Sequence, residues 1–174
     1  MKSTIVKIAQ DLANRYHAGQ FRKVAPGQQP LPYIVHPAKV VHYLKKYGVQ
    51  DEEAHAAGWL HDTLEDTTLT YEDISRATTK RVAEDVYIVT RNVDNKVYKE
   101  RIAEARYEMQ MVKLCDTLHN AKTLHLLSPS GIQRKIEDIT GFYLPLAEKI
   151  CPALAKDLQY YFEREAGIIG TQGN

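Results

Sequence analysis

The chain has 174 residues and a mass of 19.8 kDa, a length that suits one hydrophobic core and is short for two domains. Its 44% hydrophobic and 26% charged residues are typical of a globular protein and exclude a largely disordered chain. The net charge of +1 gives no overall electrostatic basis for binding nucleic acid or anionic lipid, and charges interrupt every apolar run before it could span a membrane.

The N-terminus and the two cysteines bear on whether the protein is secreted or stays in the reducing cytoplasm. Residues Met1–Lys7 lack the apolar core and the cleavage site of a signal peptide. Cys115 and Cys151 each lie in apolar sequence, which fits buried thiols better than a disulfide framework. We therefore expect a cytoplasmic protein.

Apolar residues recur at intervals of three and four along the first third of the chain, which predicts successive helices. The first covers Ile5–Tyr16, and Gly19 can end it. A second begins after His36, with Pro37 at its first position. Asp51 can cap a third, which we expect to continue through His61 and Asp62.

The rest of the chain continues this pattern. Thr70–Asp73 resembles a capping box that opens a short helix, and a valine stripe over 82–89 marks the next. Helical stretches over 97–106 and 108–127 follow a turn at 92–95, and Ser128–Gly131 closes the second of them. Another helix starts near Ile132 and should kink or divide at Pro145, and Pro152 can start the last. The pattern predicts an all-α domain over residues 1–167, with a frayed tail over 168–174.

The segment His61–Asp66 concentrates side chains that bind metals or transfer protons. On a continuous helix His61 would lie over Glu65, and Asp62 over Asp66. Burying such a group is costly unless a cation neutralises it, so the segment favours a metal site. The alternative is a solvated acidic helix end with an incidental histidine, but the apolar residues before His61 argue for burial.

Two further segments complete a candidate ligand set. His36 lies between a proline-rich loop and a helix start, where alone it is more typical of a core-edge histidine than of a ligand. Asp116, Asn120 and Thr123 form a polar stripe on one helix face, as a surface helix also does. Two imidazoles with two carboxylates suit a divalent ion such as Mn²⁺, with zinc or iron as alternatives.

Four stretches, in this order, resemble the signatures of HD-domain alarmone hydrolases of the RelA/SpoT type, a group that includes small single-domain enzymes and metazoan SpoT homologues. They are His17–Lys23, Pro32–Pro37, His61–Thr67 and Lys113–Asn120. The resemblance runs from Asp11 to Leu126 and implies an HD-domain helical bundle that acts as a stand-alone cytoplasmic hydrolase.

The resemblance also implies a reaction and roles for residues. The reaction is metal-dependent hydrolysis of the 3′-pyrophosphate of guanosine tetra- or pentaphosphate (ppGpp or pppGpp), which yields GDP or GTP and pyrophosphate. Glu65 and Asp66 would orient or deprotonate the attacking water. The metal would be held by His36, His61, Asp62 and Asp116. Arg22 would stack on the base with Lys23 beside it, and Asn120 and Thr123 would line the nucleoside pocket.

One departure from the pattern of this group leaves the identity of the substrate open. Residues 24–32 form a longer link than is usual in this group, so the loop over the base is expected to be reshaped. One alternative is an HD phosphohydrolase that acts on a dNTP, a nucleoside monophosphate or a phosphorylated dinucleotide. A catalytically silent nucleotide sensor is another, and the presence of Glu65 and Asp66 argues against it. We expect a small nucleotide as the ligand, and the oligomeric state stays open.

Overall fold

The computed structural model describes residues 4–167, and within this range the chain is helical, with one isolated bridge between Phe21 and Pro32 as the only β-type pairing. The prediction of an all-α fold is therefore confirmed for these residues, while the expected tail, 168–174, lies outside them. No helix in the described range is long and apolar enough to cross a lipid bilayer. The helices are α1 Ile5–Tyr16, α2 Val35–Lys46, α3 Glu52–Leu60, α4 Thr63–Asp66, α5 Tyr71–Ala77, α6 Lys80–Val89, α7 Asn95–Glu104, α8 Tyr107–Ala121, α9 Pro129–Asp138, α10 Leu144–Ile150 and α11 Pro152–Glu165, with the short helical turns η1 Leu124–Leu126 and η2 Ile139–Tyr143.

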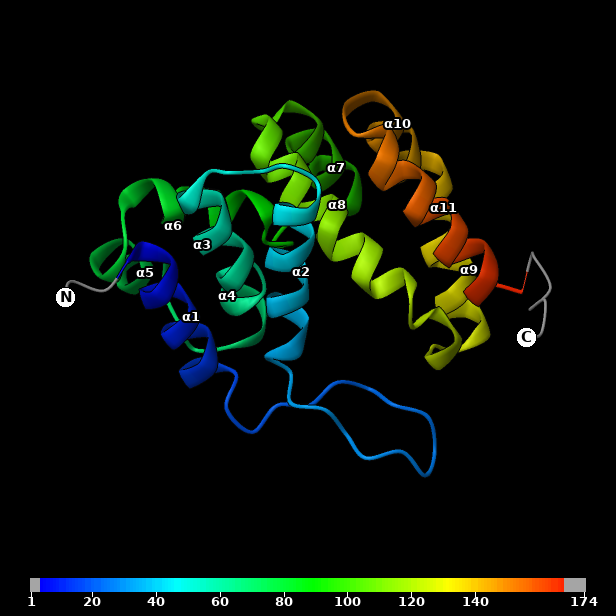
Figure 1. The fold of residues 1–174 in the computed structure, drawn as a ribbon, viewed down its shortest axis with the longest axis horizontal. Coiled ribbons are helices and arrows are strands. Elements are labelled where there is room, and N and C mark those ends of the chain that lie inside the picture. The colour runs from blue at the N-terminus through cyan, green and yellow to red at the C-terminus, as the bar shows by residue number, and fades with distance from the viewer. Residues whose placement is uncertain (1–3, 168–174) are drawn as a thin grey trace.

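Two helices, α3 and α8, form the centre of the fold. α3 packs against α1, α2 and α6, and α8 packs against α2 and α11, so that α9, α10 and α11 lie at the opposite end of the molecule from α1 and α5 (Figure 1). Every residue of α3 from Ala54 to Leu60 is buried, as is most of α8. Polar side chains at the end of α3 and in the middle of α8 are thereby brought into the interior.

Gly58 allows α2 and α3 to lie close together. A Cβ atom at this position would lie 3.0 Å from Cδ1 of Leu44 and 3.1 Å from Cγ2 of Val41, which is tighter than ordinary van der Waals contact. The close approach places the first turn of α2, with His36, beside the end of α3, with His61. The spacing of these helices is thus part of the geometry of the site described below.

The helix expected through His61 and Asp62 is interrupted. α3 ends at Leu60 and α4 begins at Thr63, and the hydroxyl of Thr63 donates to the carbonyl of Leu60 at 2.7 Å. Such a side-chain bond competes with the backbone ladder of a helix. The expectation that His61 and Glu65 share a turn of one continuous helix is therefore wrong, because Glu65 belongs to the separate short helix α4.

Other boundaries differ from the predicted ones as well: α7 spans Asn95–Glu104 in place of 97–106, and α9 begins at Pro129 in place of Ile132. α2 begins at Val35, two residues before Pro37, and therefore includes His36. α8 ends at Ala121 because Thr123 leaves the helical backbone and donates its hydroxyl to the carbonyl of Asn120 at 3.2 Å. The serine expected to close that helix, Ser128, instead caps the start of α9. The caps Asp51 and Thr70 and the start at Pro152 agree with the sequence. The helix expected to divide near Pro145 does so, because the turn η2 separates α9 from α10, which begins at Leu144.

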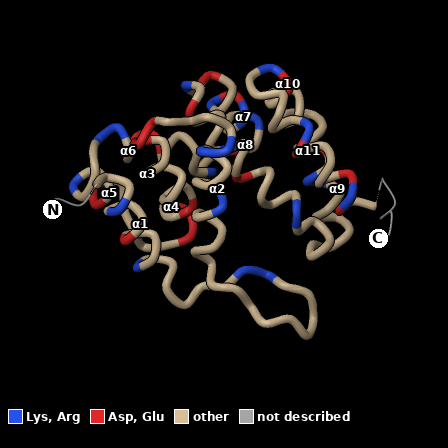
Figure 2. Tube along the Cα trace, viewed as in Figure 1, with Lys and Arg blue, Asp and Glu red and all other residues tan. Residues whose placement is uncertain are grey.

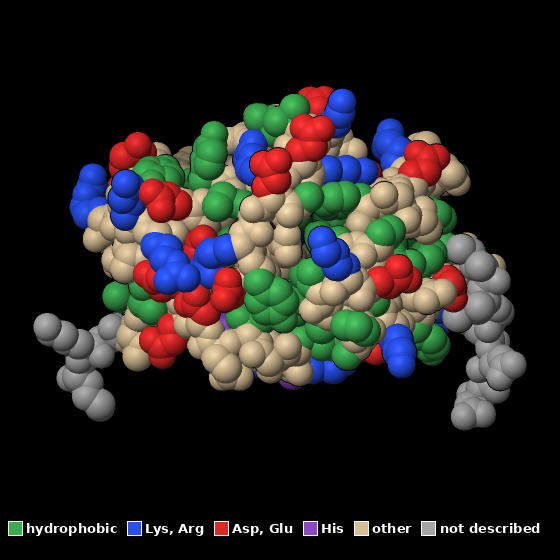
Figure 3. All heavy atoms as spheres, turned by 90° about the horizontal axis from the view of Figure 1, so that it is seen from above, with side chains coloured by type: hydrophobic (Ala, Val, Ile, Leu, Met, Phe, Trp, Pro, Cys, Tyr) green, Lys and Arg blue, Asp and Glu red, His purple; other side chains and the backbone are tan. Residues whose placement is uncertain are grey.

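Charged side chains of both signs are mixed on the face of the molecule that Figure 3 shows. On the face seen in Figure 3, acidic, basic and apolar side chains alternate over short distances. The loop between α1 and α2 projects from the helical body, and its only charged residues, Arg22 and Lys23, form a short basic segment (Figure 2). The backbone N–H of Arg22 donates to the carbonyl of Leu31 at 2.9 Å, which ties the two arms of this loop together.

Candidate metal centre and nucleotide pocket

Four side chains from three parts of the chain converge at the centre of the fold. His36 lies in the first turn of α2, His61 and Asp62 in the corner between α3 and α4, and Asp116 in α8. The Nε2 atoms of His36 and His61 are 3.1 Å apart. Oδ2 of Asp62 lies 3.3 Å and 3.0 Å from these two atoms, and Oδ1 of Asp116 lies 3.1 Å and 3.7 Å from them. The structure thus brings together all four residues that the sequence nominated as ligands.

A hydrogen bond to one backbone carbonyl fixes the orientation of the His61 ring. Its Nδ1 lies 2.9 Å from the carbonyl oxygen of Gly58, and a carbonyl can only accept, so Nδ1 carries the hydrogen. In a neutral imidazole the lone pair is then on Nε2, which faces the cluster. Metal-binding histidines are held in this way by an acceptor on their far nitrogen.

The electrostatics of the cluster favour a cation. Burial alone would lower the pKa of His61, but Asp62 and Asp116 raise it to about 10. Burial alone would raise the pKa of Asp62, but His61 and His36 hold it well below its usual range. Lys113, whose Nζ lies 2.7 Å from Oδ2 of Asp116, does the same for Asp116. The carboxylates are thus ionised and retain a proton on the nearby imidazole, which a bound metal ion would replace.

The donor set fits a divalent metal ion. One atom each of His36, His61 and Asp62 lie within 4.8 Å of one another, and Asp116 approaches both histidines from α8. Imidazole nitrogens combined with carboxylate oxygens suit Mn²⁺, Fe²⁺ or Zn²⁺. The cluster can therefore bind a metal.

Three neighbours of this cluster were not singled out as site residues from the sequence. Tyr33 donates its hydroxyl hydrogen to Oδ2 of Asp62, and Lys113 pairs with Asp116. His119 meets His36 through their Nδ1 atoms at 2.6 Å. Each lies in a stretch already noted as a motif. Lys113 and Asp116 are three residues apart on α8, and this spacing could have identified Lys113. Tyr33 and His119 contact ligands from other segments, which spacing does not reveal.

Glu65 and Asp66 end the short helix α4, three and four residues after Asp62, and both are exposed. Oε2 of Glu65 accepts the backbone N–H of Arg91 at 3.0 Å. The backbone carbonyl of Asp66 accepts from the side-chain amide of Gln20 at 2.9 Å. Burial and the charge of Asp62 raise the pKa of Asp66, which makes its carboxylate a better proton acceptor. The two residues are therefore held by different contacts.

The four residues proposed to bind nucleotide line one cavity of about 340 Å³. The guanidinium of Arg22 donates to Oδ1 of Asn120 at 3.0 Å and lies over the ring of Tyr33, 5.8 Å from its centroid. Three leucines and Phe21 make part of the wall apolar. The lining residues are Phe21, Arg22, Lys23, Tyr33, Asn120, Thr123, Leu124, Leu126, Leu127 and Lys135.

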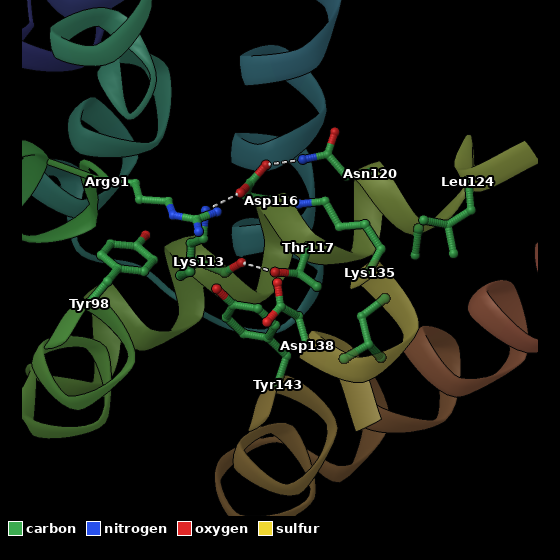
Figure 4. A pocket seen from close by; sticks show the side chains of 12 residues that line it. Arg91, Tyr98, Lys113, Asp116, Thr117, Asn120, Leu124, Lys135, Asp138 and Tyr143 are labelled. Atoms are coloured by element: carbon green, nitrogen blue, oxygen red, sulfur yellow. Dashed lines mark hydrogen bonds and ion pairs between the residues drawn. The ribbon is translucent and has the colours of Figure 1, made fainter. Parts of the chain in front are cut away.

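A smaller basic pocket of about 50 Å³ adjoins this cavity and shares Asn120, Leu124 and Lys135 with it. Figure 4 shows Arg91, Lys113 and Lys135 directed toward the space beside Asp116 from three separate parts of the chain. Two aspartates, Asp116 and Asp138, line the same space, and Nζ of Lys113 lies 2.7 Å from Oδ2 of Asp116. The pocket therefore carries one more positive than negative side chain, and Arg91 and Lys135 are the cations available to an anionic group beside the Lys113–Asp116 pair. Neither Arg91 nor Lys135 was predicted as a site residue, because no local pattern relates them to the motifs.

Comparison with known proteins identifies the type of domain. The family model described as HD domain matches residues 9–150. A guanosine-3′,5′-bis(diphosphate) 3′-pyrophosphohydrolase of Borreliella burgdorferi is 32% identical in an alignment of 154 residues that covers 82% of this chain and 22% of that protein. The protein of the same name in Aquifex aeolicus is 33% identical over 83% of this chain and 21% of its own. The chain thus spans about a fifth of the length of the curated relatives it matches.

Two further comparisons concern a differently named relative and a solved structure. A GTP pyrophosphokinase of Streptomyces coelicolor is 33% identical over 83% of this chain and 18% of its own length. A solved structure described as a metazoan orthologue of SpoT that hydrolyses ppGpp matches 97% of this chain and 99% of its own, with a TM-score of 0.77. At 24% identity this last similarity concerns the fold.

Proposed function

Because the chain belongs to the HD-domain family, we propose that it is a metal-dependent hydrolase that removes the 3′-pyrophosphate from guanosine tetra- or pentaphosphate. The products would be GDP or GTP and pyrophosphate. The observation that carries this proposal is the position of the ligand cluster beside two joined pockets, one with an apolar and cationic wall and one lined by three cations and two aspartates. A guanine nucleotide with phosphates at both ends of its ribose has groups that match both pockets.

The proposal assigns the metal to His36, His61, Asp62 and Asp116, with Mn²⁺ as the expected ion. When bound, such an ion lowers the pKa of a water molecule and offsets phosphate charge. The support for the assignment is the convergence of the four side chains and the two carboxylates among them, whose pKa values lie well below their usual range. Tyr33 and Lys113 orient Asp62 and Asp116 respectively.

Asp66 is proposed to accept the proton of the attacking water. Its raised pKa supports this role, because a general base is most effective when its pKa lies nearer the working pH. Water adds to the phosphorus next to the 3′-oxygen, the bond from that phosphorus to the 3′-oxygen breaks, and the 3′-oxygen gains a proton. Glu65 is proposed to orient the water with the oxygen that its bond to Arg91 leaves free.

The nucleotide would be held along the two pockets. Arg22 can stack on the base through its planar guanidinium, and Phe21 offers a second flat surface in the same cavity. Lys23, Asn120 and Thr123 supply polar contacts around the nucleoside. The cations of the smaller pocket would neutralise phosphate. We place the enzyme in the cytoplasm, where both of its free cysteines would stay reduced.

The test is to incubate metal-stripped protein with guanosine tetraphosphate, with and without Mn²⁺, and to separate the products by anion-exchange chromatography. Manganese-dependent formation of GDP and pyrophosphate is the expected result. Release of inorganic phosphate alone, or no turnover by a folded and metal-loaded sample, would contradict the proposal. A panel of dNTPs, nucleoside monophosphates and phosphorylated dinucleotides would then identify the substrate, because a pocket built for a 3′-pyrophosphate should discriminate against ligands without it.

A further inference from the structure

His119 on α8 meets His36 edge to edge. The two Nδ1 atoms are 2.6 Å apart, the ring centroids are 4.9 Å apart and the ring planes differ by 25°. The ring centroids are much farther apart than the two nitrogens, so the nitrogens lie between the rings and the rings meet end to end. The small angle between the ring planes makes the rings nearly coplanar. This geometry is that of a hydrogen bond in the plane of both rings, in which one Nδ1 donates and the other accepts.

The position of Nε2 of His36 decides which of the two donates. That atom lies 3.3 Å from Asp62 and 3.1 Å from Asp116, so it is the nitrogen directed at the proposed metal. A metal ligand needs its lone pair, and a neutral imidazole carries one hydrogen, so the hydrogen of His36 must be on Nδ1. Nδ1 of His119 must then accept, and the hydrogen of His119 must be on its own Nε2.

We propose that His119 is a positioning residue of the metal centre, which fixes the tautomer and the orientation of His36 by accepting a hydrogen bond from its Nδ1–H. This inference rests on the metal centre of the proposed function. The partner of a metal-bound histidine is usually a carboxylate, a backbone carbonyl or water. His61 follows that rule through the carbonyl of Gly58, whereas His36 depends on a side chain that a substitution can remove.

The test compares Mn²⁺ affinity in three variants by calorimetric titration of metal-stripped protein. His119→Leu has no acceptor and should lose about 10- to 100-fold in affinity, the usual effect of removing such a partner. His119→Asn should stay close to the wild type, because its Oδ1 is bonded to Cγ as the imidazole Nδ1 is. His42→Leu is the matched control, since His42 is an exposed histidine of the same helix as His36.

Thermal unfolding of the metal-free proteins separates positioning from general damage. A normal midpoint for His119→Leu, together with weakened Mn²⁺ binding and rescue by His119→Asn, is the result expected of a positioning residue. Equal Mn²⁺ affinity of His119→Leu and the wild type would overturn the inference and leave the proposed function standing. Equal loss in the Leu and Asn variants would also overturn it, because no acceptor would then be involved. A wild-type protein that binds no Mn²⁺ would overturn both proposals.

Discussion

The guanidinium of Arg22 donates to Oδ1 of Asn120 at 3.0 Å, and the amide nitrogen of Asn120 donates in turn to Oδ1 of Asp116 at 2.6 Å. These two bonds join the projecting loop to a residue of the proposed metal centre. They also fix the orientation of the Asn120 amide, since its oxygen accepts from one residue and its nitrogen donates to the other. The proposed base site and the proposed metal centre therefore meet at Asn120.

Arg22→Ala should raise KM roughly 5- to 30-fold, which corresponds to the loss of about 1–2 kcal/mol from a cation stacked on an aromatic base. The turnover number should change little, because Arg22 does not approach the ligand cluster directly. Arg22→Lys should behave almost like the alanine variant, since an ammonium lacks the planar surface. Steady-state kinetics with guanosine tetraphosphate measures both, and a wild-type KM in Arg22→Ala would remove the residue from the base site.

Asp62 and Asp66 should respond differently to substitution. Asp62→Ala should abolish both metal binding and activity, because its carboxylate lies 3.0 Å and 3.3 Å from the two histidine Nε2 atoms. Asp66→Asn should keep the metal and lower the turnover number about 100-fold or more, the scale of a lost general base. Metal content by mass spectrometry and turnover of the same samples distinguish the two effects.

The controls for this pair use the neighbouring carboxylate. Glu65→Gln should keep the metal and slow turnover if Glu65 orients the water. Glu72 is an exposed residue of α5, and Glu72→Gln should change neither metal content nor turnover. Full activity in Asp66→Asn would show that another group accepts the proton. Loss of metal from that variant would instead make Asp66 a ligand.

The sequence was most informative where a side chain acts through a short motif. His61 and Asp62 are adjacent, and their chemistry indicated a metal site before any distance was known. That His36 and Asp116 join them depends on the packing of α2 and α8 around α3, which sequence order does not specify. The break between α3 and α4 was missed because its cause, the hydroxyl of Thr63 bonded to a backbone carbonyl, leaves no trace in the apolar periodicity.

Phe21→Ala should weaken nucleotide binding, since base stacking on an aromatic side chain contributes about 1–3 kcal/mol. The chain offers a matched control in Leu31, which is 54% exposed against 59% for Phe21 and lies on the other arm of the same loop, but does not line the cavity. Titration with GDP and with tripolyphosphate distinguishes the contributions. Phe21→Ala should lose affinity for GDP alone, and Leu31→Ala for neither ligand. Equal loss in the two variants would mean that the loop matters only as a whole.

Gly58→Ala should destabilise the protein by about 1–3 kcal/mol, the usual cost of an extra methyl group in a packed interior. The added Cβ would press on Leu44 and Val41 and separate α2 from α3. Because His36 and His61 lie on these two helices, Mn²⁺ affinity should fall as well. Chemical denaturation and metal titration measure the two effects, and Gly141→Ala, where a Cβ meets nothing within 4 Å, is the control.

The basic pocket marks the limit of what the sequence could predict. Arg91 follows α6, Lys113 lies in α8 and Lys135 in α9, and each taken alone is an ordinary charged residue. Only the packing of these helices directs the three side chains to one space beside Asp116 (Figure 4). The aromatic and cationic residues of the loop were easier to place, because the stretch His17–Lys23 carries a recognisable motif.

The metal-free protein should lose stability as the pH rises above neutrality. In the folded state Asp62 and Asp116 raise the pKa of His61, against the effect of burial, from 6.5 to about 10. A group whose pKa is higher in the folded state stabilises the fold fully below its unfolded pKa, and this contribution disappears as the pH approaches the folded value. The midpoint of thermal unfolding should therefore fall between pH 6.5 and about 10.

Mn²⁺ should reduce this decline, because the ion takes the place of the proton on His61 and binds more tightly as the proton becomes easier to remove. At acidic pH, Asp62 and Asp116 affect stability in the opposite direction. Because their pKa values are lower in the folded state, they stabilise the fold above pH 3.8, and this contribution to stability is lost as the pH falls below about 3.8. Melting curves of the wild type and of His61→Asn, with and without Mn²⁺, test the assignment. A decline of equal size in metal-free His61→Asn would assign the effect to a different group.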